Sequence, residues 1–134
     1  MRLEGGCLCG AVRYRIEALP GDVADYCHCG QCRKASGAPV SAWIQLPPDR
    51  FAVTQGQARA YRSSDRGERW FCGDCGSPLY MTDPDQRSVG VNLGGLDDPE
   101  AVRPTVHGWN GARLSWLCLS DALPRFEREP PYDL

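Results

Sequence analysis

The amino-acid sequence predicts a single, mainly β domain over residues 1–134. Short runs in which apolar and polar residues alternate are separated by glycine, proline and aspartate along most of the chain, which is the pattern of half-buried strands joined by turns. No long stretch repeats its apolar residues about every 3.6 positions, as a major helix would. A chain of 134 residues is long enough for one modest core but not for two.

The first predicted strand follows a pair of cysteines near the N-terminus. In it Val12, Tyr14 and Ile16 alternate with charged residues, and the turn-forming stretch 19–22 ends it. The same reasoning predicts further strands at 38–46, 51–54, 58–63, 79–81, 87–93, 102–106 and 112–119. Many short strands with turn signals between them favour an all-β or β-dominated architecture.

Helical structure is predicted only as brief turns. Residues 33–37 are predicted to form one helical turn that Gly37 ends, and residues 97–100 another. The polar stretch 64–68 is expected to be a loop, and 55–57 a turn between two strands. The strands are therefore expected to position whatever site the protein has.

Charge and apolar patterning narrow the classes of function. A formal net charge of −2 gives no electrostatic basis for binding nucleic acid. No apolar run is long enough to cross a bilayer, and residues 1–6 lack the apolar segment of a secretory signal. The sequence therefore predicts a cytoplasmic protein without a nucleic-acid or membrane partner. Thiols stay reduced in that compartment, so its cysteines are expected to bind metal rather than form disulfides.

Three thiols stand within six residues at Cys27, Cys29 and Cys32, and Gly30 allows the tight backbone bend that they need to face one metal ion. A structural zinc site takes four protein ligands, whereas a catalytic site holds three and keeps one position open. This stretch offers three sulfurs. His28 is an alternative fourth ligand; otherwise it is a loop residue beside the metal.

Four further cysteines form two pairs, namely Cys7 with Cys9 and Cys72 with Cys75. The second pair has the form of a zinc knuckle, with glycines that let backbone N–H groups point at the sulfurs. Two pairs and a triplet can divide into one site of four thiolates and one of three. Spacing leaves a second division open, in which the Cys29–Cys32 pair joins the Cys72–Cys75 pair in a ribbon-like site. Zinc is the expected metal in either division.

The remaining chemically notable residues are assigned structural roles. Cys118 lies an even number of residues from Leu114 and Trp116, so in a strand all three side chains would point to the same face. Cys118 is therefore expected to be a small buried apolar residue. His107 is expected to be a hydrogen-bonded structural histidine. All tryptophans are expected to pack in the core, namely Trp43, Trp70, Trp109 and Trp116.

The cysteine motifs, taken in order, resemble the family of glutathione-dependent formaldehyde-activating enzymes, which includes centromere protein V. Residues 5–12 (Gly-Gly-Cys-Leu-Cys-Gly-Ala-Val) resemble the opening of the family, and residues 27–34 (Cys-His-Cys-Gly-Gln-Cys-Arg-Lys) its central loop. Residues 69–79 (Arg-Trp-Phe-Cys-Gly-Asp-Cys-Gly-Ser-Pro-Leu) resemble its third motif, and 123–127 (Leu-Pro-Arg-Phe-Glu) its end. The resemblance covers nearly the whole chain.

This resemblance implies a β-tent fold of the Mss4-like kind and two zinc ions per chain. It implies a structural zinc at the positions of Cys7, Cys9, Cys72 and Cys75. It implies a catalytic zinc at the positions of Cys27, Cys29 and Cys32. The implied activity is that of a carbon–sulfur lyase that joins glutathione and formaldehyde as S-hydroxymethylglutathione.

The chemistry of a three-thiolate zinc agrees with that activity. Such a zinc carries a net charge of −1 and is a weak Lewis acid, so it is a poor generator of hydroxide. It can accept a fourth thiol, lower the pKa of that thiol and hold it as a thiolate at neutral pH. A thiolate is the nucleophile that adds to formaldehyde or another small aldehyde. The alternative is a non-catalytic, zinc-stabilised β module that binds a partner.

Recognition of glutathione requires fixed cations, because glutathione carries two carboxylates and one ammonium group. Arginine suits planar carboxylates best. The candidates are the arginines nearest the metal motifs in sequence: Arg33, Arg62, Arg66 and Arg69.

Overall fold

The computed structural model describes residues 1–85 and 87–132, which form two β-sheets and one α-helix. The small sheet has the order β1 (Arg2–Gly6), β2 (Arg13–Glu17), β5 (Phe51–Gln55). The large sheet has the order β10 (Val106–Gly108), β3 (Ala24–Cys27), β4 (Ser41–Leu46), β9 (Val89–Asn92), β8 (Pro78–Thr82), β7 (Gly67–Cys72), β6 (Ala58–Ser64). The predicted mainly β fold is confirmed. Residue 86 and the last two residues of the expected 1–134 domain lie outside the described residues.

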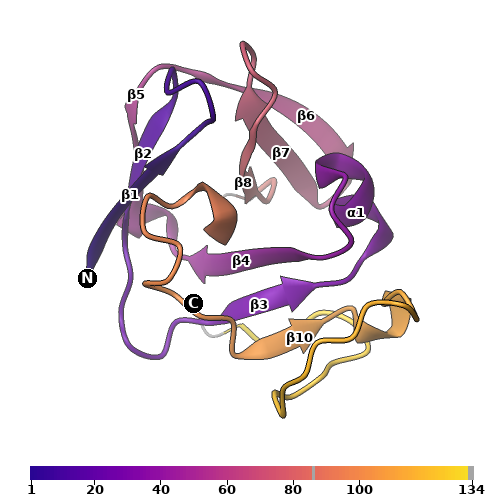
Figure 1. Ribbon diagram of the computed structural model, residues 1–134. Helices are drawn as coiled ribbons and strands as arrows, with labels where there is room; N and C mark the ends of the chain where they lie inside the picture. The colour runs from indigo at the N-terminus through magenta and orange to yellow at the C-terminus, as the bar shows by residue number, and fades with distance from the viewer. Residues whose placement is uncertain (86, 133–134) are drawn as a thin grey trace.

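The sheets are antiparallel except where β10 runs parallel to β3. Figure 1 shows the small sheet and the β6–β7–β8 part of the large sheet leaning toward each other over β4. Three short 3-10 helices complete the described elements: η1 (Pro48–Arg50), η2 (Leu93–Gly95) and η3 (Asn110–Ala112).

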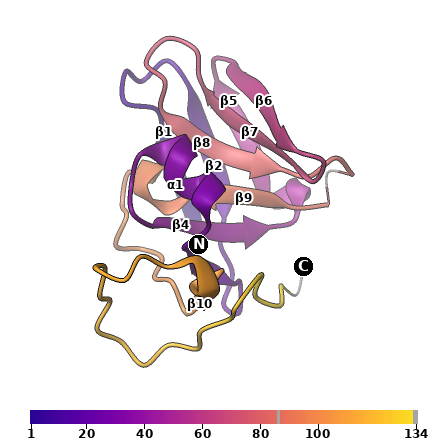
Figure 2. The same ribbon diagram turned by 90° about the vertical axis from the view of Figure 1, so that its right-hand side faces the viewer.

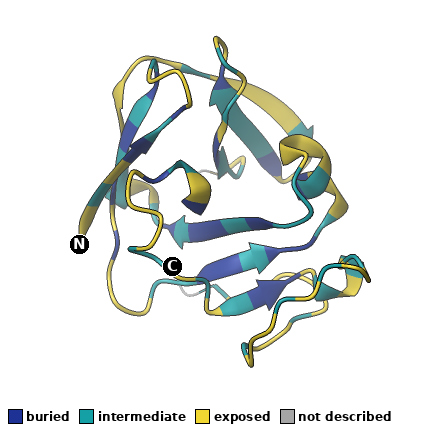
Figure 3. Ribbon diagram, in the orientation of Figure 1, coloured by how far each residue is buried: buried dark blue, intermediate teal, exposed yellow. Residues whose placement is uncertain are grey.

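The main core lies between the two sheets. Tyr14 and Ile16 from β2 are fully buried there together with Leu46 from β4 and Val91 from β9. Alternate side chains of a strand point to the same face, so the alternation in 12–16 places this apolar set inward. A register slip of one residue would turn it to solvent. Figure 3 shows the burial of β3 and β4 and the exposure of the loop that follows β10.

The three-cysteine stretch lies in the connection from β3 to β4. Cys27 is the last residue of β3, and Cys29 is the N-cap of α1 (Gly30–Ser36), which contains Cys32. The helix ends at Gly37, whose φ of 73° is the left-handed conformation that glycine adopts without strain. The predicted helical turn at 33–37 is therefore confirmed, and it begins three residues earlier than expected.

Several predicted elements differ from the structure. Strands at 102–106 and 112–119 were expected; β10 covers only Val106–Gly108, and 112–119 contains no strand. Its alternating residues do not pair with β10, whose outer side instead makes an isolated bridge between His107 and Arg125. The expected loop at 64–68 is a tight hairpin between β6 and β7, and residues 97–100 form a turn rather than a helix.

The long segment after β10 folds over one side of the large sheet. Figure 2 shows it as a broad loop beneath β10 and β4. It is attached along β10: the His107 N–H donates to the Pro124 carbonyl at 2.8 Å, and the Phe126 N–H donates to the His107 carbonyl at 2.8 Å. None of the helices in residues 1–85 and 87–132 is long and apolar enough to cross a membrane.

Candidate metal centres and the adjoining pocket

Four sulfurs converge where the turn after β1 meets the end of β7. The Sγ atoms of Cys7, Cys9, Cys72 and Cys75 all lie within 4.8 Å of one another, and we call them the four-sulfur cluster. Cys9 Sγ lies 3.6 Å from Cys7 Sγ and 3.8 Å from Cys72 Sγ. Zinc–sulfur bonds of about 2.3 Å in a tetrahedron place the sulfurs about 3.8 Å apart. The geometry therefore fits a zinc ion held by four thiolates.

Local backbone structure aims these sulfurs inward. Gly76, with a φ of 77°, closes the turn after Cys75, and its N–H donates to the Cys72 carbonyl at 2.8 Å. The Val12 N–H donates to Cys7 Sγ at 3.2 Å. Hydrogen bonds from Ser77 lower the pKa of the Cys75 thiol to about 5. Donors at the sulfurs stabilise the thiolate form that a metal requires.

Three further sulfurs converge at the start of α1. The Sγ atoms of Cys27, Cys29 and Cys32 lie within 4.8 Å of one another, with Cys27 and Cys32 at 3.4 Å; these form the three-sulfur cluster. Hydrogen bonds from Cys27 and Cys32 lower the pKa of Cys29, while contacts with Cys29 and Cys32 raise the pKa of Cys27. Thiols that share protons in this way offer a metal three ligands at one point.

The sulfurs are thus grouped as four and three. The ribbon-like alternative, in which Cys29 and Cys32 join Cys72 and Cys75, is not formed. Both clusters fit zinc by donor type, and the described residues around the three-sulfur cluster add no fourth ligand to it. A metal bound there would have a coordination position that the chain itself does not fill.

His28 belongs to a chain of hydrogen-bonded polar groups beside the three-sulfur cluster, in which the two histidines are buried. Its Nε2 atom lies 2.9 Å from Nδ1 of His107, and Nε2 of His107 lies 3.0 Å from the Asp121 carboxylate. Because the carboxylate accepts from His107, His107 in turn accepts from His28 when both rings are neutral. The backbone N–H of His28 also donates to the Gly108 carbonyl at 3.1 Å. His28 thus anchors the cysteine segment to β10, and His107 is the hydrogen-bonded structural histidine that was predicted.

A pocket of about 200 Å³ lies beside the three-sulfur cluster, between α1 and strands β4, β6, β7 and β8. Cys32 forms part of its wall, and so does Arg69, whose Nη2 donates to Cys32 Sγ at 3.6 Å. Five further residues of the wall are aromatic, and we therefore call it the aromatic pocket: Trp43, Tyr61, Trp70, Phe71 and Tyr80. Sequence reasoning missed it, because these rings come from four different strands.

The arginines predicted to contact glutathione lie in different places. Arg69 lines the aromatic pocket. Arg33 instead donates to the backbone carbonyls of His28 and Ala112, which fastens α1 to the loop after β10. Arg62 and Arg66 are exposed on the β6–β7 hairpin and are not part of the pocket wall. Of the four predicted arginines, the structure therefore brings Arg69 to the site.

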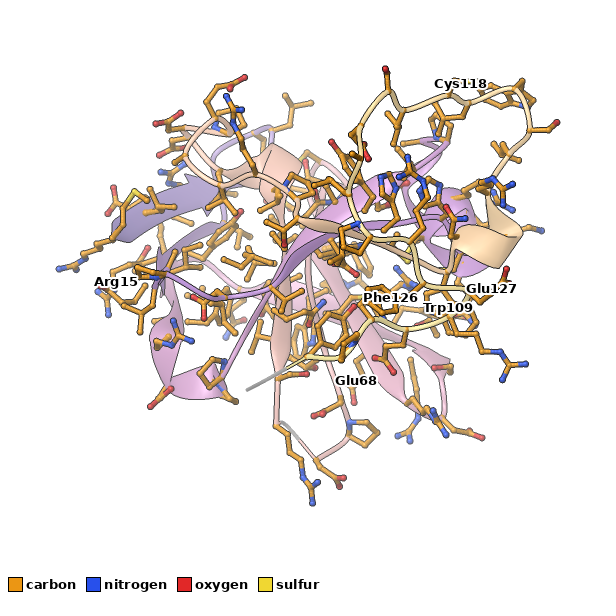
Figure 4. All side chains as sticks on the ribbon, turned by 90° about the horizontal axis from the view of Figure 1, so that it is seen from below. Arg15, Glu68, Trp109, Cys118, Phe126 and Glu127 are labelled. Carbon is orange, nitrogen blue, oxygen red and sulfur yellow. The ribbon has the colours of Figure 1, made fainter. Side chains whose placement is uncertain are left out.

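The predictions of burial for Cys118 and two tryptophans are wrong. Cys118 is exposed on the outer loop that follows β10, as Figure 4 shows. Trp116 is 70% exposed and Trp109 40% exposed. Cys118 and Trp116 were expected on the inner face of a strand, but their segment belongs to no sheet. Trp43 and Trp70, in contrast, pack against buried residues as expected.

The fold, the two cysteine clusters and their order along the chain define a mainly β protein of one recognisable type, in which each cluster could hold a metal ion. The chain belongs to the family of glutathione-dependent formaldehyde-activating enzymes, since the profile of that family matches residues 2–112. The resemblance inferred from the three motifs is thereby confirmed.

Two curated proteins are similar over part of the chain. A Halomonas elongata protein, named as a candidate glutathione-dependent formaldehyde-activating enzyme, is 38% identical over 92 residues, which are 63% of this chain and 58% of that protein. An uncharacterized lyase from Schizosaccharomyces pombe is 31% identical over 78 residues, which are 58% of this chain and 56% of that protein. The chain thus spans less than two thirds of each of these relatives.

A solved structure has a similar fold. The crystal structure of a Rhodobacter sphaeroides protein from a structural genomics programme matches 76% of this chain and 92% of its own chain, with a TM-score of 0.61 and 27% sequence identity.

Proposed function

We propose that this protein is a zinc-dependent lyase-type enzyme that joins a thiol, such as glutathione, to formaldehyde or another small aldehyde and gives an S-hydroxymethyl type of adduct. The observation that carries this proposal is the three-sulfur cluster with a pocket beside it, lined by Cys32 and Arg69. The names of the relatives from Halomonas elongata and Schizosaccharomyces pombe support the same class of reaction.

The two clusters are proposed to have different roles. The four-sulfur cluster would hold a structural zinc, because it leaves no position free and joins segments that lie 63 residues apart. The three-sulfur cluster would hold the catalytic zinc. When bound there, the metal would lower the pKa of an incoming thiol and keep that thiol deprotonated at neutral pH.

The residues of the chain would supply positioning and charge stabilisation. A thiolate adds to the aldehyde carbon: the S–C bond forms, the π bond of the carbonyl breaks, and its electron pair moves to oxygen. The guanidinium of Arg69, which lies next to Cys32, would donate hydrogen bonds to that oxygen as its negative charge develops. The proton that the thiol has lost returns to this oxygen through solvent. No oxidant or reductant is required.

Replacing Arg69 by alanine is expected to slow the reaction about 10- to 100-fold, in line with the loss of a charged hydrogen bond worth about 1.5–3 kcal/mol. Exchange NMR at equilibrium measures how fast glutathione and formaldehyde interconvert with their adduct. The control is Arg103→Ala, which removes the same charge from an exposed position outside the pocket. Both variants should retain the metal content of the wild type.

The remaining candidate glutathione contacts are tested in the same assay. Arg33, Arg62 and Arg66 lie outside the pocket wall, so we expect their replacement by alanine to change the rate less than Arg69→Ala does. If the zinc-loaded wild type does not accelerate exchange at millimolar thiol and aldehyde, the proposed activity is wrong, and a non-catalytic zinc-stabilised module is the better description.

A further inference from the structure

The aromatic pocket is much larger than the aldehyde in the family's name. Its volume is about 200 Å³. A water molecule occupies about 30 Å³ in the liquid, and an apolar cavity of about 150 Å³ in another protein binds benzene. Formaldehyde has only two heavy atoms, so it would leave most of this pocket unfilled. The volume suits a ring-bearing molecule.

The aromatic residues of the pocket wall differ in how firmly they are packed. Trp43 is only 6% exposed and packs with Cys27 and Cys32. Trp70 and Tyr80 stack with ring centroids 5.5 Å apart and planes at 12°. The indole N–H of Trp70 donates to Thr82 at 2.9 Å, so its polar atom already has a partner. Trp70 and Tyr80 also pack in the main core, whereas Tyr61 is 66% exposed. The wall thus offers a planar ligand apolar contact, part of it from side chains that are already packed.

The pocket wall contains one cationic side chain, that of Arg69. Among the described residues of this wall, Arg69 is the single lysine or arginine, and no aspartate or glutamate is present. Glutathione has two carboxylates and an ammonium group, so its charged ends find too few partners inside the aromatic walls. One polar oxygen, in contrast, can accept from Arg69 while the rest of the ligand contacts the rings.

We propose that the aromatic pocket binds the organic part of an aromatic or similarly bulky apolar aldehyde, with the carbonyl oxygen at Arg69 and the carbonyl carbon beside the three-sulfur cluster. This inference rests on the proposed function and names its aldehyde class. The thiolate forms the S–C bond, the carbonyl electron pair moves to oxygen, and a solvent proton completes a hemithioacetal. The charged ends of the thiol remain outside the aromatic walls.

The binding test uses an unreactive probe and the zinc-loaded full chain. Benzamide carries the ring and a carbonyl oxygen but does not add thiols, and acetamide keeps the carbonyl without the ring. NMR titration of the tryptophan indole N–H signals should show benzamide binding at least tenfold more tightly than acetamide. Ala35 is exposed on α1 and lines the pocket; Ala35→Phe should fill it and weaken benzamide binding at least tenfold. Lys34→Phe, on the same helix but outside the wall, should have no such effect.

The kinetic test compares aldehydes with one thiol. With glutathione, kcat/KM should be at least tenfold higher for benzaldehyde than for formaldehyde, and Ala35→Phe should reverse that preference. The inference is overturned if benzamide does not bind, if Ala35→Phe does not weaken benzamide binding, or if formaldehyde remains the better substrate. If benzamide binds and Ala35→Phe weakens it, but no aldehyde reacts with any thiol, the proposed reaction fails and the ligand class is supported.

Discussion

Cys72→Ser is expected to unfold the domain or to destabilise it severely. Cys72 is 1% exposed and belongs to the four-sulfur cluster, which fastens the turn after β1 to the end of β7. Structural zinc contributes about 10–16 kcal/mol of binding free energy in small zinc peptides, and a whole domain is stable by only about 5–15 kcal/mol. Loss of that metal therefore removes an amount comparable to the entire stability. Circular dichroism during heating, with metal analysis of the same sample, measures the effect.

The matched control is Cys118→Ser. It makes the same chemical change at an exposed cysteine that belongs to neither cluster, so its melting temperature and metal content should equal those of the wild type. A Cys72→Ser protein with two zinc ions per chain and a near-native melting temperature would show that the four-sulfur cluster is not a structural metal site.

Cys29→Ser is expected to abolish activity while the fold survives. The three-sulfur cluster lies within one short segment, so it does not hold distant parts of the chain together. Cys29 is the N-cap of α1, where its sulfur accepts from the Cys32 N–H at 3.3 Å. Serine is a favoured N-cap residue, so the helix should keep its start while the metal loses a ligand. We expect one zinc per chain, an ordered circular dichroism spectrum and no acceleration of thiol exchange.

Two outcomes would contradict this expectation for Cys29→Ser. If the variant loses both metals together with its dichroism, the three-sulfur cluster is structural. If it keeps full activity, the reaction takes place elsewhere. Cys118→Ser serves again as the control for the loss of a thiol.

Local sequence predicts a strand well where the strand has neighbours to pair with and a core to face. The alternation at Val12, Tyr14 and Ile16 predicted β2 correctly, because β2 has neighbours on both sides and a core to face. The segment 112–119 alternates as well, yet it has no strand to pair with and lies on an exposed loop. Alternation of apolar and polar residues indicates that a segment can form a half-buried strand. Whether a sheet edge is free for that strand depends on contacts far away in sequence.

The candidate site was predictable to a similar, partial extent. Spacing identified three groups of cysteines along the sequence, because ligands of one metal often lie close in sequence. The family resemblance gave their division into one cluster of four sulfurs and one of three. The aromatic pocket could not be predicted, since Trp43 and Tyr80 are brought together by strand order rather than by a motif. Arg69 was named for glutathione, but its position beside Cys32 depends on how β7 meets α1.

The most direct test is the number of sulfur atoms around zinc, measured by X-ray absorption before and after the addition of glutathione. A protein with one four-sulfur and one three-sulfur zinc should show a mean of about 3.5 sulfurs per zinc, rising to about 4 when a thiol fills the free position. The Cys29→Ser variant, with its one remaining zinc, should show about 4 in both states. A wild-type mean of about 4 without added thiol, or a mean that does not rise at saturating glutathione, would contradict a thiol-binding zinc at Cys27, Cys29 and Cys32.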